Sequence, residues 1–295
     1  MRITKLGVVA GSTAENIEAS SHGDHGDAHV HQHEDGTIHE HTDGTVHIHS
    51  HDDEYGHAHS HAAHEEDAQL VSLEARILDK NDRLAERNRA WLAGRGVFAL
   101  NLMSSPGAGK TTLLERTLAE LSEEIAMSVV EGDQETTNDA ERIRKTGCNV
   151  VQINTGQGCH LEADMVAQGL QEIDPATGSV VFIENVGNLV CPALFDLGEA
   201  ARVVILAVTE GEDKPVKYPH MFHGADLVLI NKIDLLPHLS FDLERCLGYV
   251  REVAHHAKVL EISASTGEGL EEWFVWLREH RNGALLEAKK ALVRS

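Results

Sequence analysis

LNLMSSPGAGKTTLL, residues 100–114, is the stretch that decides the fold. An apolar run typical of a strand leads into a loop of Ser, Pro, Gly and Ala, after which Lys110 and Thr111 open a helical pattern. This order indicates a phosphate-binding P-loop, in which small residues let backbone N–H groups turn toward phosphates. Lys110 would reach the β- and γ-phosphates and the Thr111 hydroxyl would ligate Mg²⁺. Ser104 stands where the motif usually has its first Gly. The predicted phosphate-binding residues are Ser105, Gly107, Ala108, Gly109, Lys110, Thr111 and Thr112.

Beyond Gly96, short apolar runs alternate with helical patterns. The predicted strands are Phe98–Met103, Met127–Val130, Val150–Ile153, Val180–Ile183, Val203–Val208, Leu227–Ile230 and Val259–Ile262. The predicted helices are Lys110–Ser122, Asn138–Lys145, Leu161–Glu172, Phe241–His255 and Leu270–Arg281. This alternation predicts an α/β fold with a mostly parallel sheet over residues 97–295. Ligands of such a fold bind at the carboxyl ends of the strands.

The sequence NKID follows one of these predicted strands and indicates guanine specificity. Asp234 can accept from guanine N1–H and N2–H₂, a pattern that adenine lacks. Asn231 would reach the base edge, and Lys232 would cover the base and brace the P-loop. Ser263 and Ala264, after the last predicted strand, match the element that supports guanine O6. Taken alone, NKID is also compatible with an ordinary polar turn, but its place behind a P-loop favours a GTP site.

Carboxylates at two other strand ends are candidates for Mg²⁺ chemistry. Glu184 ends an apolar run in the manner of a Walker B motif, and Gly187 stands where a switch backbone would sense the γ-phosphate. Asp133, and less strongly Asp139, fits a first switch loop, although a turn and helix cap would use the same residues. We predict catalytic roles for Lys110, Asp133 and Glu184 and Mg²⁺ binding by Thr111, Asp133 and Glu184. No Gln follows Gly187, so intrinsic GTP hydrolysis should be slow.

Cys159, His160 and Cys191 form a candidate metal site because each follows a predicted strand. Both loops should therefore lie on the same edge of the sheet as the nucleotide. Three ligands leave a four-coordinate ion incomplete, and a second chain related by a two-fold axis could supply more. The alternative is that these cysteines are small hydrophobic residues, as expected for Cys148 and Cys246. His220 and His223 lie in a loop and are weaker candidate ligands.

The N-terminal part has a different composition. Fourteen of the 21 histidines lie between His22 and His64, among Asp, Glu, Gly and Ser, and residues 35–42 and 43–50 form an imperfect repeat. Such a segment should be disordered without ligand and could hold several metal ions weakly, although a merely solvated polar tail is the alternative. The candidate tail ligands are His29, His31, His33, His39, His41, His47, His49, His51, His57, His59 and His61. We therefore expect a flexible tail over residues 1–69 and a linking helix over 70–96.

Charge and composition exclude several classes of function. The formal net charge of −23 argues against nucleic acid or an acidic membrane surface as the main partner. No apolar run is long enough to span a membrane, and the first residues make a poor export signal. The four cysteines are not needed as disulfides in a chain with this many core residues. We expect a cytoplasmic protein with reduced thiols.

Together these motifs resemble the HypB family, the nickel-incorporation GTPases of [NiFe]-hydrogenase maturation. The segments that carry the resemblance are SSPGAGKT (104–111), EGD (131–133), GCHLEA (158–163), ENVGNLVCP (184–192), KPVKYP (214–219) and NKID (231–234). The resemblance covers the chain from about Leu73 to its end and is specific, because metal-ligand and GTPase motifs occur together. A CxxCGC motif found near the N-terminus of some members is lacking, and the histidine tract stands in its place.

What the resemblance implies is a SIMIBI-class GTPase that forms a homodimer on binding GTP and Mg²⁺. It would bind nickel or zinc at the Cys/His site across the dimer interface. It would deliver nickel to the hydrogenase large-subunit precursor, with the zinc-containing accessory protein HypA as a partner. Three alternatives stay open: a urease-accessory GTPase, a nickel storage protein whose GTPase domain controls dimerisation, and a zinc metallochaperone.

Overall fold

The computed structural model describes residues 2–5, 30–32, 38–40, 60–133 and 138–294, with side chains from residue 75 onward except residue 138. Strands β2 (Val30–Gln32) and β3 (Ile38–Glu40) pair in antiparallel fashion, with His31 opposite His39. His61 lies in helix α1 (Ser60–Gly94). The other candidate tail ligands lie outside the described residues: His29, His33, His41, His47, His49, His51, His57 and His59. Metal binding by the tail and the division of the chain at residues 69 and 96 stay predictions.

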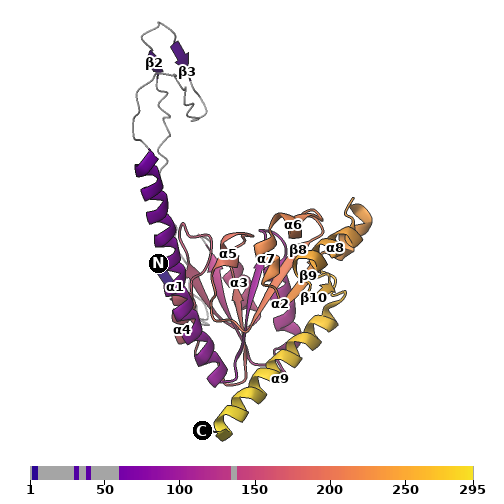
Figure 1. Cartoon of the computed structure of the whole chain (residues 1–295). Coiled ribbons are helices and arrows are strands. Elements are labelled where there is room, and N and C mark those ends of the chain that lie inside the picture. The colour runs from indigo at the N-terminus through magenta and orange to yellow at the C-terminus, as the bar shows by residue number, and fades with distance from the viewer. Residues whose placement is uncertain (1, 6–29, 33–37, 41–59, 134–137, 295) are drawn as a thin grey trace, which may run out of the picture. The chain divides into compact units, whose positions relative to one another are not determined.

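Eight strands form one sheet in the order β1-β6-β5-β7-β4-β8-β9-β10 (Figure 1). They are β1 (Arg2–Lys5), β4 (Phe98–Ser104), β5 (Met127–Asp133), β6 (Asn149–Asn154), β7 (Val180–Glu184), β8 (Ala201–Ala207), β9 (Leu227–Asn231) and β10 (Lys258–Glu261). All neighbours run parallel except the edge strand β1, which is antiparallel to β6. The predicted mostly parallel α/β sheet is confirmed. β1 was not predicted, because its sequence RITK has neither a sustained apolar run nor a clear alternation.

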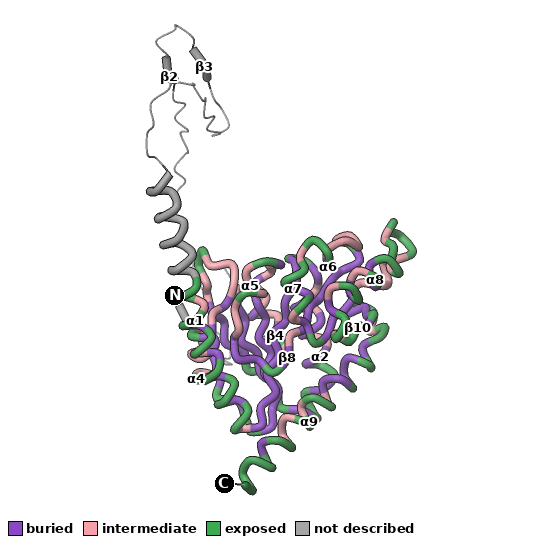
Figure 2. Tube along the Cα trace, viewed as in Figure 1, coloured by how far each residue is buried: buried purple, intermediate pink, exposed green. Residues whose placement is uncertain are grey.

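Helices cover both faces of this sheet. They are α2 (Lys110–Leu121), α3 (Asn138–Lys145), α4 (Ala163–Ile173), α5 (Cys191–Leu194), α6 (Lys214–Lys217), α7 (Pro219–His223), α8 (Leu243–Val253) and α9 (Leu270–Arg294), with a 3₁₀ helix at Ile233–His238. Apolar residues of α2, α3 and α9 pack on one face, and those of α1, α4, α7 and α8 on the other. Because both faces are covered, the central strands are buried along their length (Figure 2). None of the helices in the described part is long and apolar enough to cross a bilayer.

The parallel arrangement brings the carboxyl ends of β4, β5, β7 and β9 to one edge of the sheet. Each of these strands ends in a polar residue: Ser104, Asp133, Glu184 and Asn231 respectively. β5 continues past the predicted end at Val130, because its residues pair with β6 as far as Asp133 and with β7 as far as Glu131. The acidic segment expected as a loop is therefore a strand as far as Asp133.

Helix α1 is fastened to the α/β unit by two buried asparagines. The Asn81 amide donates to the Asp196 carbonyl at 2.7 Å and accepts from the Ala163 N–H at 2.9 Å. The Asn88 amide donates to the carbonyls of Ala163 and Leu197 at 2.8 and 3.0 Å. The expected helix 70–96 is therefore a packed element from Asn81 onward. α9 extends beyond the predicted end at Arg281 in a similar way, because Ala288 is buried there.

Asn88→Ala should destabilise the α/β unit, because it leaves two buried carbonyls without their donor. The expected loss of unfolding free energy is about 1–3 kcal/mol, measured by urea denaturation of the full chain. Arg83→Ala is the matched control on the same helix, since its ion pair with Asp79 at 2.8 Å is exposed and should contribute less than about 1 kcal/mol. Equal effects of the two substitutions would contradict a fastening role for Asn88.

Candidate functional site

The loop between β4 and α2 has the geometry of a P-loop. Gly109 has φ +101°, and a Cβ there would lie 2.5 Å from the Asn231 amide nitrogen, so this position needs glycine. α2 begins at Lys110, and its amino end faces the loop. The Lys110 Nζ donates to the Ser104 Oγ at 2.9 Å, and burial lowers the pKa of this ammonium. The Ser that replaces the usual Gly thus holds the phosphate-binding lysine.

Thr111 and Glu184 form the candidate Mg²⁺ position. The Thr111 hydroxyl donates to the Glu184 Oε1 at 2.8 Å. The second carboxylate oxygen of Glu184 is buried and has no hydrogen-bond partner. Burial raises the pKa of Glu184 to about 7, although the nearby Lys110 opposes the shift. A hydroxyl beside a buried carboxylate with an unpaired oxygen fits a hard divalent cation such as Mg²⁺.

A polar cavity of about 490 Å³ lies over these groups. It is lined by Pro106, Gly107, Gly109, Lys110, Thr111, Thr112, Asp133, Asp139, Arg142, Glu184, Val186, Gly187 and Lys232. Residues predicted from sequence thus meet in one cavity although they come from separate strand ends. The other predicted nucleotide residues lie outside that lining: Ser105, Ala108, Asn231, Asp234, Ser263 and Ala264.

Arg142 and Glu131 belong to this region but were not predicted. Arg142, on α3, donates to Glu115 at 2.6 Å and to Asp139 and the Thr112 hydroxyl at 3.3 Å each. Glu131 lies opposite Glu184 in the β5–β7 register and is buried with one oxygen unpartnered. Burial, with repulsion from Glu184, raises its pKa to about 9. Glu131 was part of the EGD motif, but only the pairing of β5 with β7 shows that it lies opposite Glu184.

The NKID segment is tied to the P-loop. The Asn231 amide donates to the Ala108 carbonyl at 2.8 Å and accepts from the Ala264 N–H at 3.0 Å. The Lys232 Nζ donates to the Gly107 carbonyl at 2.7 Å, as expected for a brace. Asn231 thus joins two loops, and its contact with the base edge stays a prediction. One oxygen of Asp234 is buried and has no hydrogen-bond partner, which fits a carboxylate that receives guanine donors.

The Ser263–Ala264 element takes part in its own loop. The Ser263 hydroxyl lies 3.2 Å from that of Ser265 and accepts from the Thr266 N–H at 3.1 Å. The Ala264 N–H already donates to Asn231. The assignment of this element to guanine O6 stays a prediction.

Cys159, His160 and Cys191 come together at the same edge of the sheet. Their ligand atoms all lie within 4.8 Å of one another, with the two sulfur atoms 2.9 Å apart. The His160 ring stacks on Phe195 with centroids 4.0 Å apart, and its buried Nε2 has no hydrogen-bond partner. Burial lowers the pKa of His160, which favours the neutral ring that can bind metal. The Asn188 side chain accepts from the Cys191 N–H at 3.4 Å and shapes the loop.

The ligand chemistry of this cluster suits nickel or zinc, since both accept thiolate and imidazole. The contact with Cys159 raises the pKa of the Cys191 thiol, so a bound cation would have to displace its proton. The other two cysteines differ, because burial raises the pKa of Cys148 and of Cys246 to about 12 each. Cys148 and Cys246 therefore favour the neutral thiol and lie outside the cluster, whereas the sulfur atoms of Cys159 and Cys191 are adjacent.

Asn185 connects the two sites. It directly follows Glu184, and its buried side-chain oxygen accepts from the Leu161 N–H at 3.2 Å and the Val186 N–H at 3.0 Å. Leu161 is the residue after His160, and a Cβ at Gly132 would lie 2.7 Å from its side chain. The loop that carries Cys159 and His160, called the metal loop below, is therefore hydrogen-bonded through Leu161 to Asn185 at the end of β7 and packed against the end of β5.

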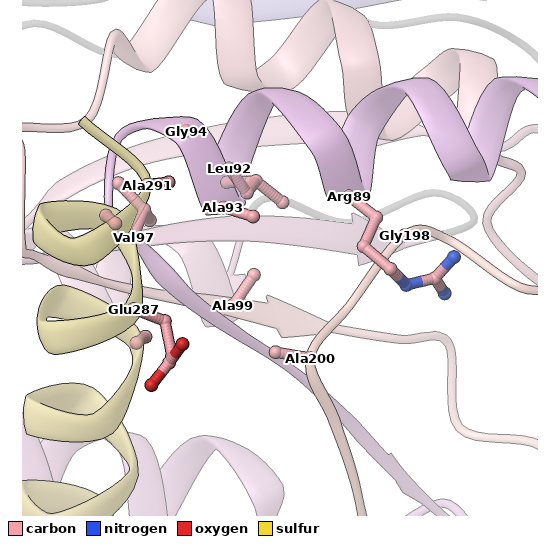
Figure 3. A pocket seen from close by; sticks show the side chains of 12 residues that line it. Arg89, Leu92, Ala93, Gly94, Val97, Ala99, Gly198, Ala200, Glu287 and Ala291 are labelled. Carbon is pink, nitrogen blue, oxygen red and sulfur yellow. The ribbon is translucent and has the colours of Figure 1, made fainter. Parts of the chain in front are cut away.

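A second cavity, of about 410 Å³, lies where α1 and α9 meet the start of β4 (Figure 3). Leu92, Ala291 and other small apolar side chains form most of its walls. Its charged residues are Glu287 and Arg89, and Arg89 is bound by both carboxylate oxygens of Asp196 at 2.7 Å. This cavity lies at the amino end of β4, away from the P-loop, and offers no set of donors for phosphate.

Glu131→Gln should change how stability depends on pH. In the folded chain Glu131 keeps its proton up to about pH 9, far above its ordinary value of 4.5. Between these values the folded state binds more protons than the unfolded state, so the free energy of unfolding falls as pH rises. The glutamine variant lacks this component. The free energy of unfolding of this variant, relative to that of the parent chain, should therefore rise by up to about 1.4 kcal/mol for each pH unit.

This dependence is measured by urea unfolding without nucleotide at a series of pH values from about 5 to about 8. Glu123→Gln, at an exposed position, is the control and should follow the parent chain. Parallel pH curves for Glu131→Gln and the parent would show that Glu131 ionises normally.

Comparisons with known proteins give the same picture. Residues 98–261 match the family model of the CobW/HypB/UreG nucleotide-binding domain. The hydrogenase maturation factor HypB of Azotobacter chroococcum mcd 1 is 54% identical over 230 residues, which cover 78% of this chain and 75% of that protein. The HypB of Escherichia coli K12 is 53% identical over 222 residues, covering 75% and 77%.

Solved structures extend this likeness to the fold. The HypB structure from Archaeoglobus fulgidus has a TM-score of 0.65 at 41% identity and covers 69% of this chain and all of that one. The HypB structure from Helicobacter pylori in complex with nickel has a TM-score of 0.65 at 38% identity, covering 69% and 96%. With the P-loop, the guanine-type segment and the Cys/His cluster at one edge of the sheet, this chain belongs to the HypB family of hydrogenase maturation factors.

Proposed function

We propose that this chain is a GTP-hydrolysing metallochaperone that binds nickel at Cys159, His160 and Cys191. It would deliver the ion to the large-subunit precursor of a [NiFe]-hydrogenase. The observation that carries the proposal is the bonding of the metal loop to the end of β7 through Asn185. A metal loop that is attached to a nucleotide-sensing strand can change its affinity when the nucleotide changes. The nickel complex of the relative from Helicobacter pylori supports nickel as the ion.

For the nucleotide we propose GTP with Mg²⁺. P-loop N–H groups and Lys110 would bind the phosphates, while Asp234 would accept from the guanine N–H groups. Thr111, Asp133 and Glu184 would hold Mg²⁺, which neutralises charge on the phosphates when it is bound. Asp133, which lies at the end of β5 in the cavity wall, would orient the attacking water. Hydrolysis should be slow in the isolated chain, because no glutamine follows Gly187.

The γ-phosphate would be sensed by the segment after Glu184. A Cβ at Gly187 would lie 3.0 Å from the Pro106 Cα, so this backbone touches the P-loop directly. Cys191 follows four residues later and opens α5. A shift of this segment would move one sulfur ligand, whereas Cys159 and His160 are placed by β6. GTP would also draw two chains into a homodimer in which a second set of ligands completes the ion's coordination.

Two partners and one accessory role complete the proposal: a HypA-type zinc protein, the hydrogenase precursor, and nickel storage by the histidine tract. The zinc alternative rests on the same ligand set, which takes zinc readily. A urease-accessory role is less favoured, since the relatives reported above are hydrogenase maturation factors. Gene deletion distinguishes these roles through loss of hydrogenase activity with urease intact, or the reverse. Deletion of residues 22–64 should abolish storage but spare maturation.

Nickel titration of the full chain with GDP and with a non-hydrolysable GTP analogue tests the central claim. The nickel affinity of the Cys/His site should differ between the two nucleotides. Cys191→Ser should abolish that difference and leave nickel binding by the tail in place. Cys148→Ser is the matched control, because its thiol is half-buried and outside the metal cluster. Identical nickel affinity with both nucleotides would reject GTP-controlled delivery and leave storage as the function.

Asn185→Ala should uncouple nickel binding from nucleotide binding. The substitution removes the acceptor of the Leu161 and Val186 N–H groups. In allosteric proteins one ligand typically changes the affinity for another by about 5- to 150-fold. In this variant the effect of the nucleotide on nickel affinity should fall toward none. GTP binding itself should persist. Asn101→Ala is the matched control, because it removes the partner of the Asn185 amide at 3.3 Å and leaves the bond to Leu161 intact. Equal coupling in both variants would show that the connection runs elsewhere.

A further inference from the structure

Three exposed histidines meet on the surface where α7 and α8 end. His223 is the last residue of α7, and His255 and His256 lie in the turn after α8. The rings of His255 and His256 have centroids 5.4 Å apart, and those of His223 and His256 lie 6.3 Å apart. None of the three lines the polar cavity or belongs to the Cys/His cluster.

The His255–His256 separation matches what one metal ion requires of two imidazoles, whereas the His223–His256 separation is longer. With metal–nitrogen distances of about 2.0–2.1 Å, each ring centroid lies about 3.2 Å from the ion. Two rings at a tetrahedral angle then have centroids about 5 Å apart, so the His223 ring would have to approach the His256 ring by about 1 Å. The rings of each neighbouring pair are now nearly perpendicular, at 80° and 84°. Rotation of exposed side chains, which takes picoseconds to nanoseconds, would turn their nitrogens toward a common point.

His223 has a backbone partner of the kind that supports metal-binding histidines. Its Nδ1 lies 3.4 Å from the Val253 carbonyl, to which it can donate, and this contact leaves Nε2 for an ion. Such a bond from the other ring nitrogen to a carbonyl is the usual support of a metal-binding histidine. The turn that carries His255 and His256 is also fixed, since Ala254 N–H donates to the Val250 carbonyl at 2.7 Å and Ala257 N–H to the Ala254 carbonyl at 2.9 Å.

We propose that His223, His255 and His256 form a second metal site on the α/β unit, for a divalent transition ion such as Ni²⁺ or Zn²⁺. Neutral imidazoles suit such ions, and the strongly acidic chain attracts cations. Three protein ligands at an exposed position leave at least one coordination position open, so the bound ion can exchange. α7 also packs against α5, the helix that begins at Cys191. The site is separate from the proposed GTP-controlled delivery and does not depend on it.

The test is chemical footprinting of histidines in the full chain. Carbethoxylation with diethyl pyrocarbonate is followed by peptide mass spectrometry, which reports each histidine separately. Titration with Ni²⁺, and separately with Zn²⁺, should protect His223, His255 and His256 with one common midpoint concentration. His238, exposed and outside the trio, should stay reactive throughout.

His256→Gln distinguishes a shared ion from three separate contacts. Removal of a group that merely orients a ligand costs about 10- to 100-fold in metal affinity, so loss of a ligand should raise the midpoint for His223 and His255 by at least about tenfold. His238→Gln is the matched control and should leave that midpoint unchanged. The proposal is overturned if the three histidines are protected independently, or if none is protected at metal concentrations that saturate the Cys/His cluster. A failure of GTP-controlled delivery would leave this footprint unaltered.

Discussion

The removal of water from Lys110 and Glu184 is the constraint on which the rest of the structure depends. Burial lowers the pKa of the Lys110 ammonium and raises that of the Glu184 carboxylate to about 7. Each group loses water on burial, and the attraction between the two charges offsets only part of that cost. Phosphates and a divalent cation supply charges of the opposite sign. On the proposed function, a site built in this way would gain stability from its ligands. The parallel sheet makes the arrangement possible, because it supports both groups with strands that are buried on each face.

The same edge of the sheet joins the nucleotide chemistry to the metal chemistry. Glu184 and Asn185 are neighbours in sequence, and they serve the candidate Mg²⁺ position and the metal loop respectively. Only one peptide bond separates the two functions, so no long pathway through the core is needed. Since the Asn185 oxygen accepts two backbone N–H groups in a buried place, breaking either bond carries a desolvation cost. The connection is therefore better suited to two discrete arrangements than to gradual drift.

The sequence was sufficient where the chemistry fixes residue identity. A P-loop, a guanine-type segment and paired sulfur ligands each need particular atoms at particular spacings, so the sequence alone marks Lys110, Asp234 and Cys191 as candidate site residues. It was insufficient where the role depends on a neighbour in space. Nothing in the pattern distinguishes Asn185 as a bridge, and Glu131 becomes unusual only through its register with Glu184. The motif suggests Asn231 for the base edge, but it does not reveal that the Asn231 amide also joins two loops.

Under the proposed function, the affinity for the metal ion depends more on the positions of the metal-binding side chains than on their number. Cys159 and His160 are placed by β6 and by the packing of Leu161 against β5, whereas Cys191 belongs to the segment that contacts the P-loop through Gly187. An ion that needs both sulfur atoms at about 2.3 Å tolerates little change in the distance between them. A small displacement of the Cys191 segment would therefore weaken binding without any change of ligand. By reciprocity, a bound ion that fixes Cys191 must bias the nucleotide site by the same free energy.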